Sequence, residues 1–232
     1  AVVRSVARRI GPDPDEISAF ADALSSAKNP ALIYGSGIAR GEGWDTGIKL
    51  AEKLNVKVWA APASERTPFP ETHPLYAGGL PFAIAPLSKK LEGHDLAIVI
   101  GAPVFRYYPY IAGQYIPDGL RLLHITDDPA EAGRAPVGDS LLSDPVLALE
   151  ELLARVKPRK AAPAGIARQE HRMAPYPAAK TPEKKPDGPI SSLELFLTLR
   201  ASTPEDTILV EESPSNLGEL HTAWPIDKPD SF

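Results

Sequence analysis

The stretch Ala31-Leu32-Ile33-Tyr34-Gly35 is a short continuous apolar run that ends in glycine. Such a run is typical of a strand whose two faces are both buried in a parallel sheet. Similar runs follow at residues 56–60, 96–101 and 121–126, and a shorter one at 139–142. Apolar residues spaced three and four apart predict intervening and flanking helices over residues 15–27, 44–54, 83–91 and 145–156. This alternation predicts a doubly wound α/β domain over residues 1–157, with a parallel sheet and helices on both faces.

The composition excludes several classes of protein. The 232 residues carry 25 basic and 30 acidic side chains, a net charge of −5, which argues against a nucleic-acid or anionic-membrane partner. The chain has no cysteine, so disulfide scaffolds, thiolate metal sites and cysteine nucleophiles are excluded. No apolar run approaches the ~20 residues of a membrane span. The chain begins at Ala1 and its single methionine is Met173, so we expect either that it has lost its initiating residue or that it is a piece of a longer protein.

The second half of the chain changes character. Residues 158–189 are rich in proline and basic residues and poor in large aliphatic residues, which predicts an extended linker. A nucleic-acid-binding arm is the less favoured alternative, because Tyr176 is the only aromatic residue there. Residues 190–232 predict a helix capped by Ser191 and Glu194, a strand at 207–210 and a short helix after 216. These elements cannot form a core alone, so we expect the start of a truncated second α/β domain.

Two strand ends could bind a ligand or simply turn the chain. The loop Gly35–Gly41 follows the first strand, as in dinucleotide-binding folds, but its G-x-G-x-x-x-G spacing is one residue too long. The second strand also ends at Ala60 without the carboxylate that would hold a ribose. We therefore favour a tight strand-to-helix turn. Asp127 and Asp128 could bind ribose or metal, but we favour a capping role before Pro129.

Three further groups of residues contain side chains that could form a site. The five histidines are far apart in sequence, so we expect no metal site from their spacing. The aromatic segment Phe105–Tyr110 lies in the crevice outside the strand ends, where it could bind a ligand or pack under the loop, and the residues favour neither. Residues 211–216 could form an anion cradle at a helix start. We favour an ordinary N-cap there, from Ser213 or Ser215.

Four stretches, at residues 29–37, 93–101, 124–131 and 210–215, carry a family resemblance. The chain resembles the central domain and the first part of the third domain of thiamine diphosphate-dependent 2-keto-acid decarboxylases and carboligases. Within this family it is most similar to the benzoylformate decarboxylase branch, through the proline-rich segment 61–74, the run Ile100–Tyr107 and the segment 113–115. The resemblance covers nearly the whole chain and weakens in the linker.

The resemblance implies an enzyme whose other parts lie outside this chain. An N-terminal pyrimidine-binding domain would supply a glutamate, and the rest of a C-terminal diphosphate-binding domain would hold Mg²⁺ with thiamine diphosphate. Active sites would lie between subunits of a cytoplasmic homodimer or homotetramer. The reaction would be decarboxylation of an aromatic 2-keto acid such as benzoylformate to an aldehyde, and this fragment alone would be inactive. Central domains of relatives bind FAD or ADP, but the benzoylformate branch does not, so no FAD is expected.

The resemblance also assigns roles to individual residues. Ser215 matches a serine that binds the cofactor diphosphate, and Pro214 stands where relatives have a threonine with the same role. Phe232 matches an aromatic residue near the substrate pocket. Tyr108 takes the place of a histidine that transfers a proton, and a phenol with pKa ~10 is a poorer proton shuttle at pH 7 than imidazole. The alternatives are a carboligase of the acetolactate synthase type and a nucleotide-binding module without catalysis.

Overall fold

A computed structural model describes residues 4–5, 9–105, 109–159, 188–213 and 215–232. Its centre is a sheet in which every pairing is parallel, with the strand order β3-β2-β1-β4-β5-β6. The strands are β1 (Pro30–Tyr34), β2 (Val58–Ala60), β3 (Tyr76–Gly79), β4 (Leu96–Ile100), β5 (Arg121–Thr126) and β6 (Asp139–Leu142). The doubly wound α/β fold predicted from the sequence is confirmed.

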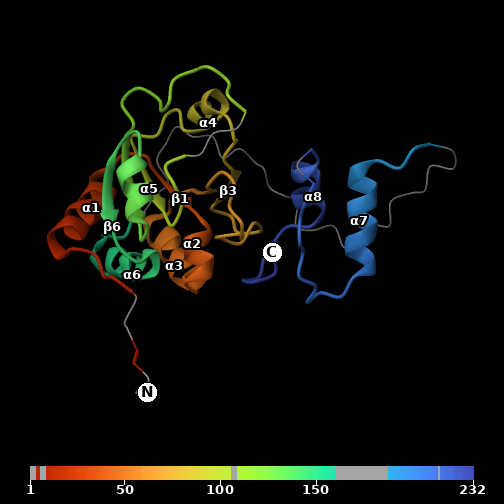
Figure 1. Ribbon diagram of the computed structural model, residues 1–232, viewed down its shortest axis with the longest axis horizontal. Helices are drawn as coiled ribbons and strands as arrows, with labels where there is room; N and C mark the ends of the chain where they lie inside the picture. Colours follow the sequence, from red (N-terminus) through yellow and green to blue (C-terminus); the bar gives the residue numbers. More distant parts are fainter. Residues whose placement is uncertain (1–3, 6–8, 106–108, 160–187, 214) are drawn as a thin grey trace.

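The two faces of the sheet are covered by different helices (Figure 1). Leu32 and Tyr34 of β1 point to the face covered by α1 (Pro14–Ser26), α3 (Trp44–Leu54) and α6 (Pro145–Arg155). Ala31 and Ile33 point to the other face, where α4 (Ile84–Lys90) and long loops pack. All five residues of β1 are buried, which explains why the strand reads as one apolar run.

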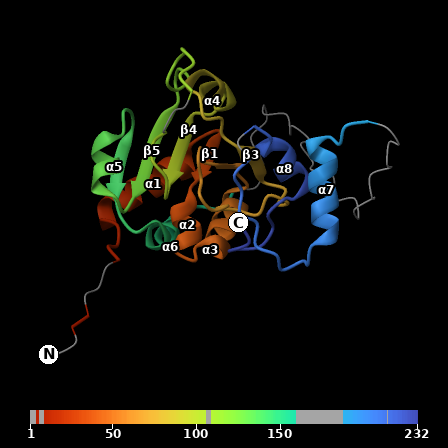
Figure 2. The same cartoon turned by 45° about the vertical axis from the view of Figure 1, so that its right-hand side comes forward.

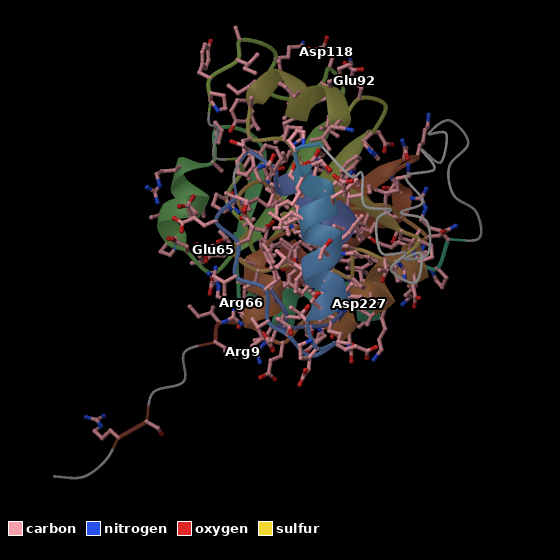
Figure 3. The ribbon with its side chains drawn as sticks, turned by 90° about the vertical axis from the view of Figure 1, so that its right-hand side faces the viewer. Arg9, Glu65, Arg66, Glu92, Asp118 and Asp227 are labelled. Carbon is pink, nitrogen blue, oxygen red and sulfur yellow. The ribbon has the colours of Figure 1, made fainter. Side chains whose placement is uncertain are left out.

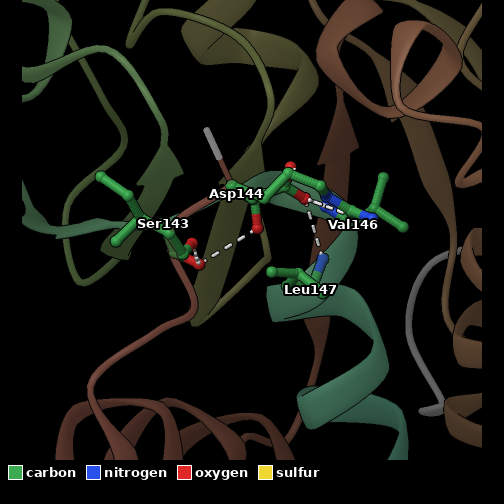
Figure 4. A network of polar contacts seen from close by, with 6 residues as sticks. Ser143, Asp144, Val146 and Leu147 are labelled. Atoms are coloured by element: carbon green, nitrogen blue, oxygen red, sulfur yellow. Dashed lines mark hydrogen bonds and ion pairs between the residues drawn. The ribbon is translucent and has the colours of Figure 1, made fainter. Parts of the chain in front are cut away.

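Three of the described helices begin with a proline that follows a capping aspartate. Figure 4 shows the Asp144 carboxylate accepting hydrogen bonds from the amides of Val146 and Leu147, at 2.9 and 3.0 Å. Arg9 donates two further bonds to Asp144, so the chain before α1 is held at the start of α6. Asp128 accepts in the same way from the first turn of α5 (Pro129–Arg134), which confirms its predicted capping role.

The Gly93-His94-Asp95 stretch has a structural role. The Asp95 carboxylate accepts from the amides of Lys28 and Asn29, at 2.6 and 2.8 Å, and the His94 ring donates from Nδ1 to the Asn29 carbonyl at 3.0 Å. Partial burial opposes the charged form of Asp95, but these backbone hydrogen bonds outweigh it and lower its pKa. The start of β1 is therefore held beside the start of β4.

Three elements differ from the sequence prediction. Strand β3 lies within residues 61–81, where the richness in proline and glycine predicts a long loop, because an edge strand that is only partly buried needs no apolar run. The short helix α2 (Ser36–Arg40) occupies the glycine loop after β1. Residues 207–210 were predicted to be a strand and are not one, because their backbone is not paired in a ladder. Ile208 and Val210 are 66% and 89% exposed, and the Leu209 amide donates to the Ser231 carbonyl.

The first residues of the predicted linker are attached to the sheet domain. The Arg159 amide donates to the Lys53 carbonyl at 3.0 Å. Its guanidinium donates to the carbonyls of Ala27 and Lys28, at 2.5 and 2.8 Å. Residues 160–187 lie outside the described residues, so the division into a domain at 1–157, a linker at 158–189 and a second domain at 190–232 stays a prediction.

We expect Gly35→Ala to destabilise the chain, because the added Cβ would lie 2.4 Å from the Gly101 carbonyl oxygen. Overpacking of this kind costs about 1–3 kcal/mol of unfolding free energy, and here it meets rigid backbone. Gly133→Ala in α5 is the matched control, because its Cβ would meet no atom within 4 Å. Urea denaturation would measure both variants, and equal stability of the two would contradict the steric argument.

Candidate functional site

The centre of the carboxyl edge of the sheet is closed by backbone packing. The strand order reverses between β1 and β4, where open α/β sheets usually bind ligands. Here the amides of Gly35 and Gly37 donate to the carbonyls of Ile100 and Gly101, both at 2.9 Å. Because these amides already have protein partners, they are not available to hold a phosphate. The loop therefore turns the chain, as predicted, but it does so through the short helix α2, which the sequence did not predict.

A shallow pocket of about 270 Å³ lies beside this closed centre, at the ends of β4 and β5. It is lined by Pro103, Val104, Phe105, Tyr115, Glu131, Arg134 and Pro136. Of the predicted aromatic segment, Phe105 is buried in the core under the loop, whereas Tyr110 is 79% exposed. Residues 106–108 lie outside the described residues, and with them the predicted catalytic residue Tyr108.

His124 is a core residue rather than a ligand. The ring is fully buried on β5, with Nδ1 3.0 Å from the Ser140 hydroxyl and Nε2 2.9 Å from the Ala102 carbonyl oxygen. Burial lowers its pKa despite the bond to Ala102, so the neutral form is favoured. Among the described residues, no group of three or more histidines, aspartates and glutamates could hold a metal ion. Nor does the described part of the chain contain a helix suited to crossing a membrane.

The C-terminal segment, residues 190–232, packs beside the β3 edge of the sheet. It contains α7 (Ser192–Ser202) and α8 (Leu217–Ala223), and the predicted capping box of Ser191 and Glu194 is confirmed. Figures 1 and 2 both show α8 next to β3 and α7 outermost. A small apolar cluster joins this segment to α3 and consists of Trp44, Leu220, Trp224 and Ile226.

Ser215 lies exposed in the turn that leads into α8. The prediction that Ser213 or Ser215 caps this helix is wrong, because the N-cap is Asn216, which makes no side-chain capping bond. The turn is closed by the backbone instead, with the Asn216 amide donating to the Ser213 carbonyl at 3.0 Å. Ser215 is thus an exposed hydroxyl at the start of a helix, and Pro214 lies outside the described residues.

Phe232 lines an open pocket of about 620 Å³ between the loop after β2 and the C-terminal segment. The other lining residues are Ser64, Glu65, Arg66, Ile208, Leu209, Val210, Glu211 and Asp230. Arg66 and Asp230 form an ion pair of 2.9 Å across it. Figure 3, which looks onto α7, shows Glu65 and Arg66 close together beside this segment. Ser215 does not line the pocket, so the structure does not bring together the predicted diphosphate and substrate residues.

A buried carboxylate that the sequence analysis missed holds the C-terminal segment in place. Glu71, 7% exposed, accepts from His221 Nδ1 at 2.9–3.0 Å, from the Ile226 amide at 2.8 Å and from the Tyr76 hydroxyl at 3.2 Å. The Glu71 amide donates to the Ile226 carbonyl at 2.8 Å. The ring of Phe232 packs on that of His221, with centroids 5.2 Å apart.

The electrostatics of this network favour a charged histidine. Burial opposes the charged form of His221, but the hydrogen bond and charge of Glu71, with a contribution from Glu211, outweigh it and raise the pKa of His221. Burial, and next the charge of Glu71, raise the pKa of Tyr76, so its phenol stays protonated and donates. No sequence motif signals the network, because Glu71 and His221 are 150 residues apart.

Comparisons with known proteins identify relatives over nearly the whole chain. The family model of the thiamine pyrophosphate enzyme central domain matches residues 17–152. Benzoylformate decarboxylase of Pseudomonas aeruginosa is 38% identical over 229 residues, which cover 99% of this chain and 42% of that protein.

Two solved structures align with the whole chain. The crystal structure of benzoylformate decarboxylase from Polynucleobacter necessarius has a TM-score of 0.88 and 44% identity. The Rhodococcus jostii RHA1 thiamine diphosphate-dependent 4-hydroxybenzoylformate decarboxylase has a TM-score of 0.81 and 36% identity. Both alignments cover 100% of this chain and 42% of the solved one, so the chain spans less than half the length of its relatives.

We expect the docking of the C-terminal segment to weaken as the pH rises from about 6 to 8, around the ordinary pKa of histidine. A raised pKa in the folded state stabilises the protein below the unfolded pKa of His221, and this contribution is lost as the pH rises through the folded value. Hydrogen bonds to charged groups contribute about 1.5–3 kcal/mol, which sets the upper limit of the effect.

Urea denaturation of the wild-type chain and His221→Gln at several pH values would measure this loss. The comparison with the variant is needed because the lowered pKa values of His94 and His124 act in the opposite direction. The free-energy difference between wild type and variant should shrink with rising pH. A difference that grows or stays constant would contradict the assignment of a charged His221.

Proposed function

The chain belongs to the thiamine pyrophosphate enzyme family, whose central domain it contains, and on that premise we propose that it is part of an aromatic 2-keto-acid decarboxylase. The full-length protein would convert a substrate such as benzoylformate to the aldehyde and CO₂. The observation that carries this proposal is the 36–44% identity to benzoylformate and 4-hydroxybenzoylformate decarboxylases over 99–100% of the chain. The similarity includes the C-terminal segment as well as the sheet domain.

Thiamine diphosphate, when bound, supplies the electron sink that accepts the electron pair of the breaking carbon–carbon bond. The donors of this chain fit part of that group: the exposed Ser215 hydroxyl and the first-turn amides of α8 are suited to a diphosphate, since no side chain among the described residues caps that helix. The residues that would hold Mg²⁺ and make the remaining cofactor contacts would lie in parts of the full-length protein outside this chain. We propose that the pyrimidine-binding domain also lies outside this chain.

Phe232 offers an apolar wall for an aromatic substrate. Its ring lines the 620 Å³ pocket, which also contains the exposed side chains of Ile208 and Val210. Arg66, although paired with Asp230, brings a positive charge that suits a substrate carboxylate. We keep Tyr108 as the proposed proton-donating residue, with Pro214 as a position where one hydroxyl contact to the diphosphate is missing.

The nucleotide-binding alternative is less well supported. The amides of the Gly35 loop, which would hold a dinucleotide phosphate, already donate to the carbonyls of residues 100 and 101. The proposal therefore includes no FAD. A carboligase remains the second candidate within the family. We also propose a cytoplasmic homodimer or homotetramer, with active sites between subunits.

The purified full-length protein should release benzaldehyde from benzoylformate when thiamine diphosphate and Mg²⁺ are added, whereas the 232-residue chain should not. Product analysis by liquid chromatography would measure both. Formation of an acetohydroxy acid from pyruvate, in place of aldehyde, would identify a carboligase. Turnover by the isolated chain would contradict the proposal that the missing domains complete the site.

Ser215→Ala in the full-length protein should raise the thiamine diphosphate concentration needed for half-maximal activity. Loss of one hydrogen bond to a charged group corresponds to about tenfold to a hundredfold in affinity. Ser202→Ala is the matched control, because that hydroxyl bonds only locally, to the Thr198 carbonyl of α7. Titration of the apoenzyme with cofactor would measure both variants, and an unchanged affinity for S215A would remove Ser215 from the cofactor site.

A further inference from the structure

The position of Phe232 depends on a chain of contacts that begins in the sheet domain. Glu71, in the loop between β2 and β3, binds the His221 ring and the backbone of Ile226. The His221 ring packs on the Phe232 ring at 5.2 Å, with an angle of 56° between the planes. The Glu71 carboxylate is therefore linked to the pocket residue Phe232 through the His221 ring.

Assuming the proposed function, we propose that Glu71 and His221 are positioning residues that hold Phe232 at the wall of the substrate pocket. Neither residue lines the pocket, so each would act through Phe232 rather than on the substrate. The loop after β2 would thereby set the width of a pocket whose wall belongs to the C-terminal segment.

The form of the network suits positioning better than general stability. A buried ion pair adds little net stability over apolar packing of the same volume, but it fixes geometry because each polar atom needs its partner. Glu71 receives donors from a side chain, a backbone amide and a phenol, which leaves its carboxylate one orientation. That orientation sets the plane of the His221 ring.

The rest of the segment has fewer buried restraints. Between residues 226 and 232, the Arg66–Asp230 ion pair is exposed, and the Ser231 carbonyl accepts from the Leu209 amide. Exposed pairs contribute at most about 1 kcal/mol and are screened by salt. Phe232 also packs against the apolar cluster of Trp44, Leu220, Trp224 and Ile226, but apolar contacts are non-directional. The buried hydrogen bonds of Glu71 to His221 and Ile226 are therefore the directional restraints that can fix the orientation of the Phe232 ring.

The charged groups around His221 come from two elements. Glu71 belongs to the loop between β2 and β3 and also accepts from the Tyr76 hydroxyl at Oε1, and Glu211 precedes α8. Both acids favour the protonated ring, in which Nδ1 and Nε2 are donors. As the ring loses its charge at higher pH, the hold on Phe232 should weaken, which gives the positioning role a pH-dependent signature.

Steady-state kinetics of the full-length protein with benzoylformate would test the proposal. Glu71→Gln keeps the volume but removes the charge, and it should raise KM on the order of tenfold while kcat changes less. Glu52→Gln is the matched control, because Glu52 also pairs with a histidine, His73 at 3.3 Å, but its carboxylate lies outside the Phe232 contacts. An E52Q variant with the same rise in KM would overturn the proposal.

A double-mutant cycle would separate positioning from general destabilisation. If Glu71 acts through Phe232, Glu71→Gln should add no further rise in KM to Phe232→Ala. Additive effects of the two substitutions would overturn the proposal.

His221→Gln, which keeps the bonds of Glu71 to Ile226 and Tyr76, should reproduce the KM effect, and this variant replaces E71Q as the test if E71Q does not fold. Wild-type KM should rise between pH 6 and 8 more than that of H221Q, and parallel pH profiles would also overturn it.

A measurement without turnover distinguishes this proposal from the proposed function. In the 232-residue chain, the ring current of Phe232 should shift the His221 ring proton signals, as shown by comparison with Phe232→Ala. Glu71→Gln should abolish most of that difference, and a difference that persists would overturn the positioning role. A Glu71-dependent contact in a full-length protein that decarboxylates no aromatic 2-keto acid would instead overturn the proposed function.

Discussion

A carboxylate can be buried only where hydrogen bonds replace the water it loses, and Glu71 meets this requirement with donors from both parts of the chain. The apolar cluster around Trp44 and Trp224 brings the C-terminal segment to α3, but apolar contacts are non-directional. The bonds to Glu71 add direction. The orientation of Phe232 beside the pocket therefore depends on Glu71, which lies in the loop between β2 and β3 and not in the C-terminal segment.

The packing at the carboxyl edge of the parallel sheet explains why the two pockets lie on either side of the strand crossover and not at it. At the strand crossover, Gly35 and Gly37 bring the backbone of the first loop onto Gly101 so closely that added Cβ atoms would collide with it. This contact fills the place where many α/β proteins hold a nucleotide. Cavities are left on either side of it, and the larger one is bounded by the C-terminal segment.

Much of the fold was predictable because buried parallel strands and amphipathic helices leave strong periodic patterns, as in Ala31–Gly35. The edge strand Tyr76–Gly79 was missed because it is only half-buried, and residues 207–210 were misread because a strand also requires a paired neighbour. The family resemblance is confirmed by the match over residues 17–152. The Glu71–His221 pair was beyond sequence reasoning, since it arises from tertiary docking of segments 150 residues apart.

The guanidinium of Arg159 has a practical consequence for protein engineering. It donates to the carbonyls of Ala27 and Lys28 just after α1, and the backbone amide of Arg159 donates to the Lys53 carbonyl near the end of α3. A shortened polypeptide that ended at the last turn of α6 would lack Arg159, so these three carbonyls would lose their hydrogen-bond donors and be exposed to solvent. A shortened protein that contains only the sheet domain, for crystallisation or fusion, should therefore end downstream of this arginine.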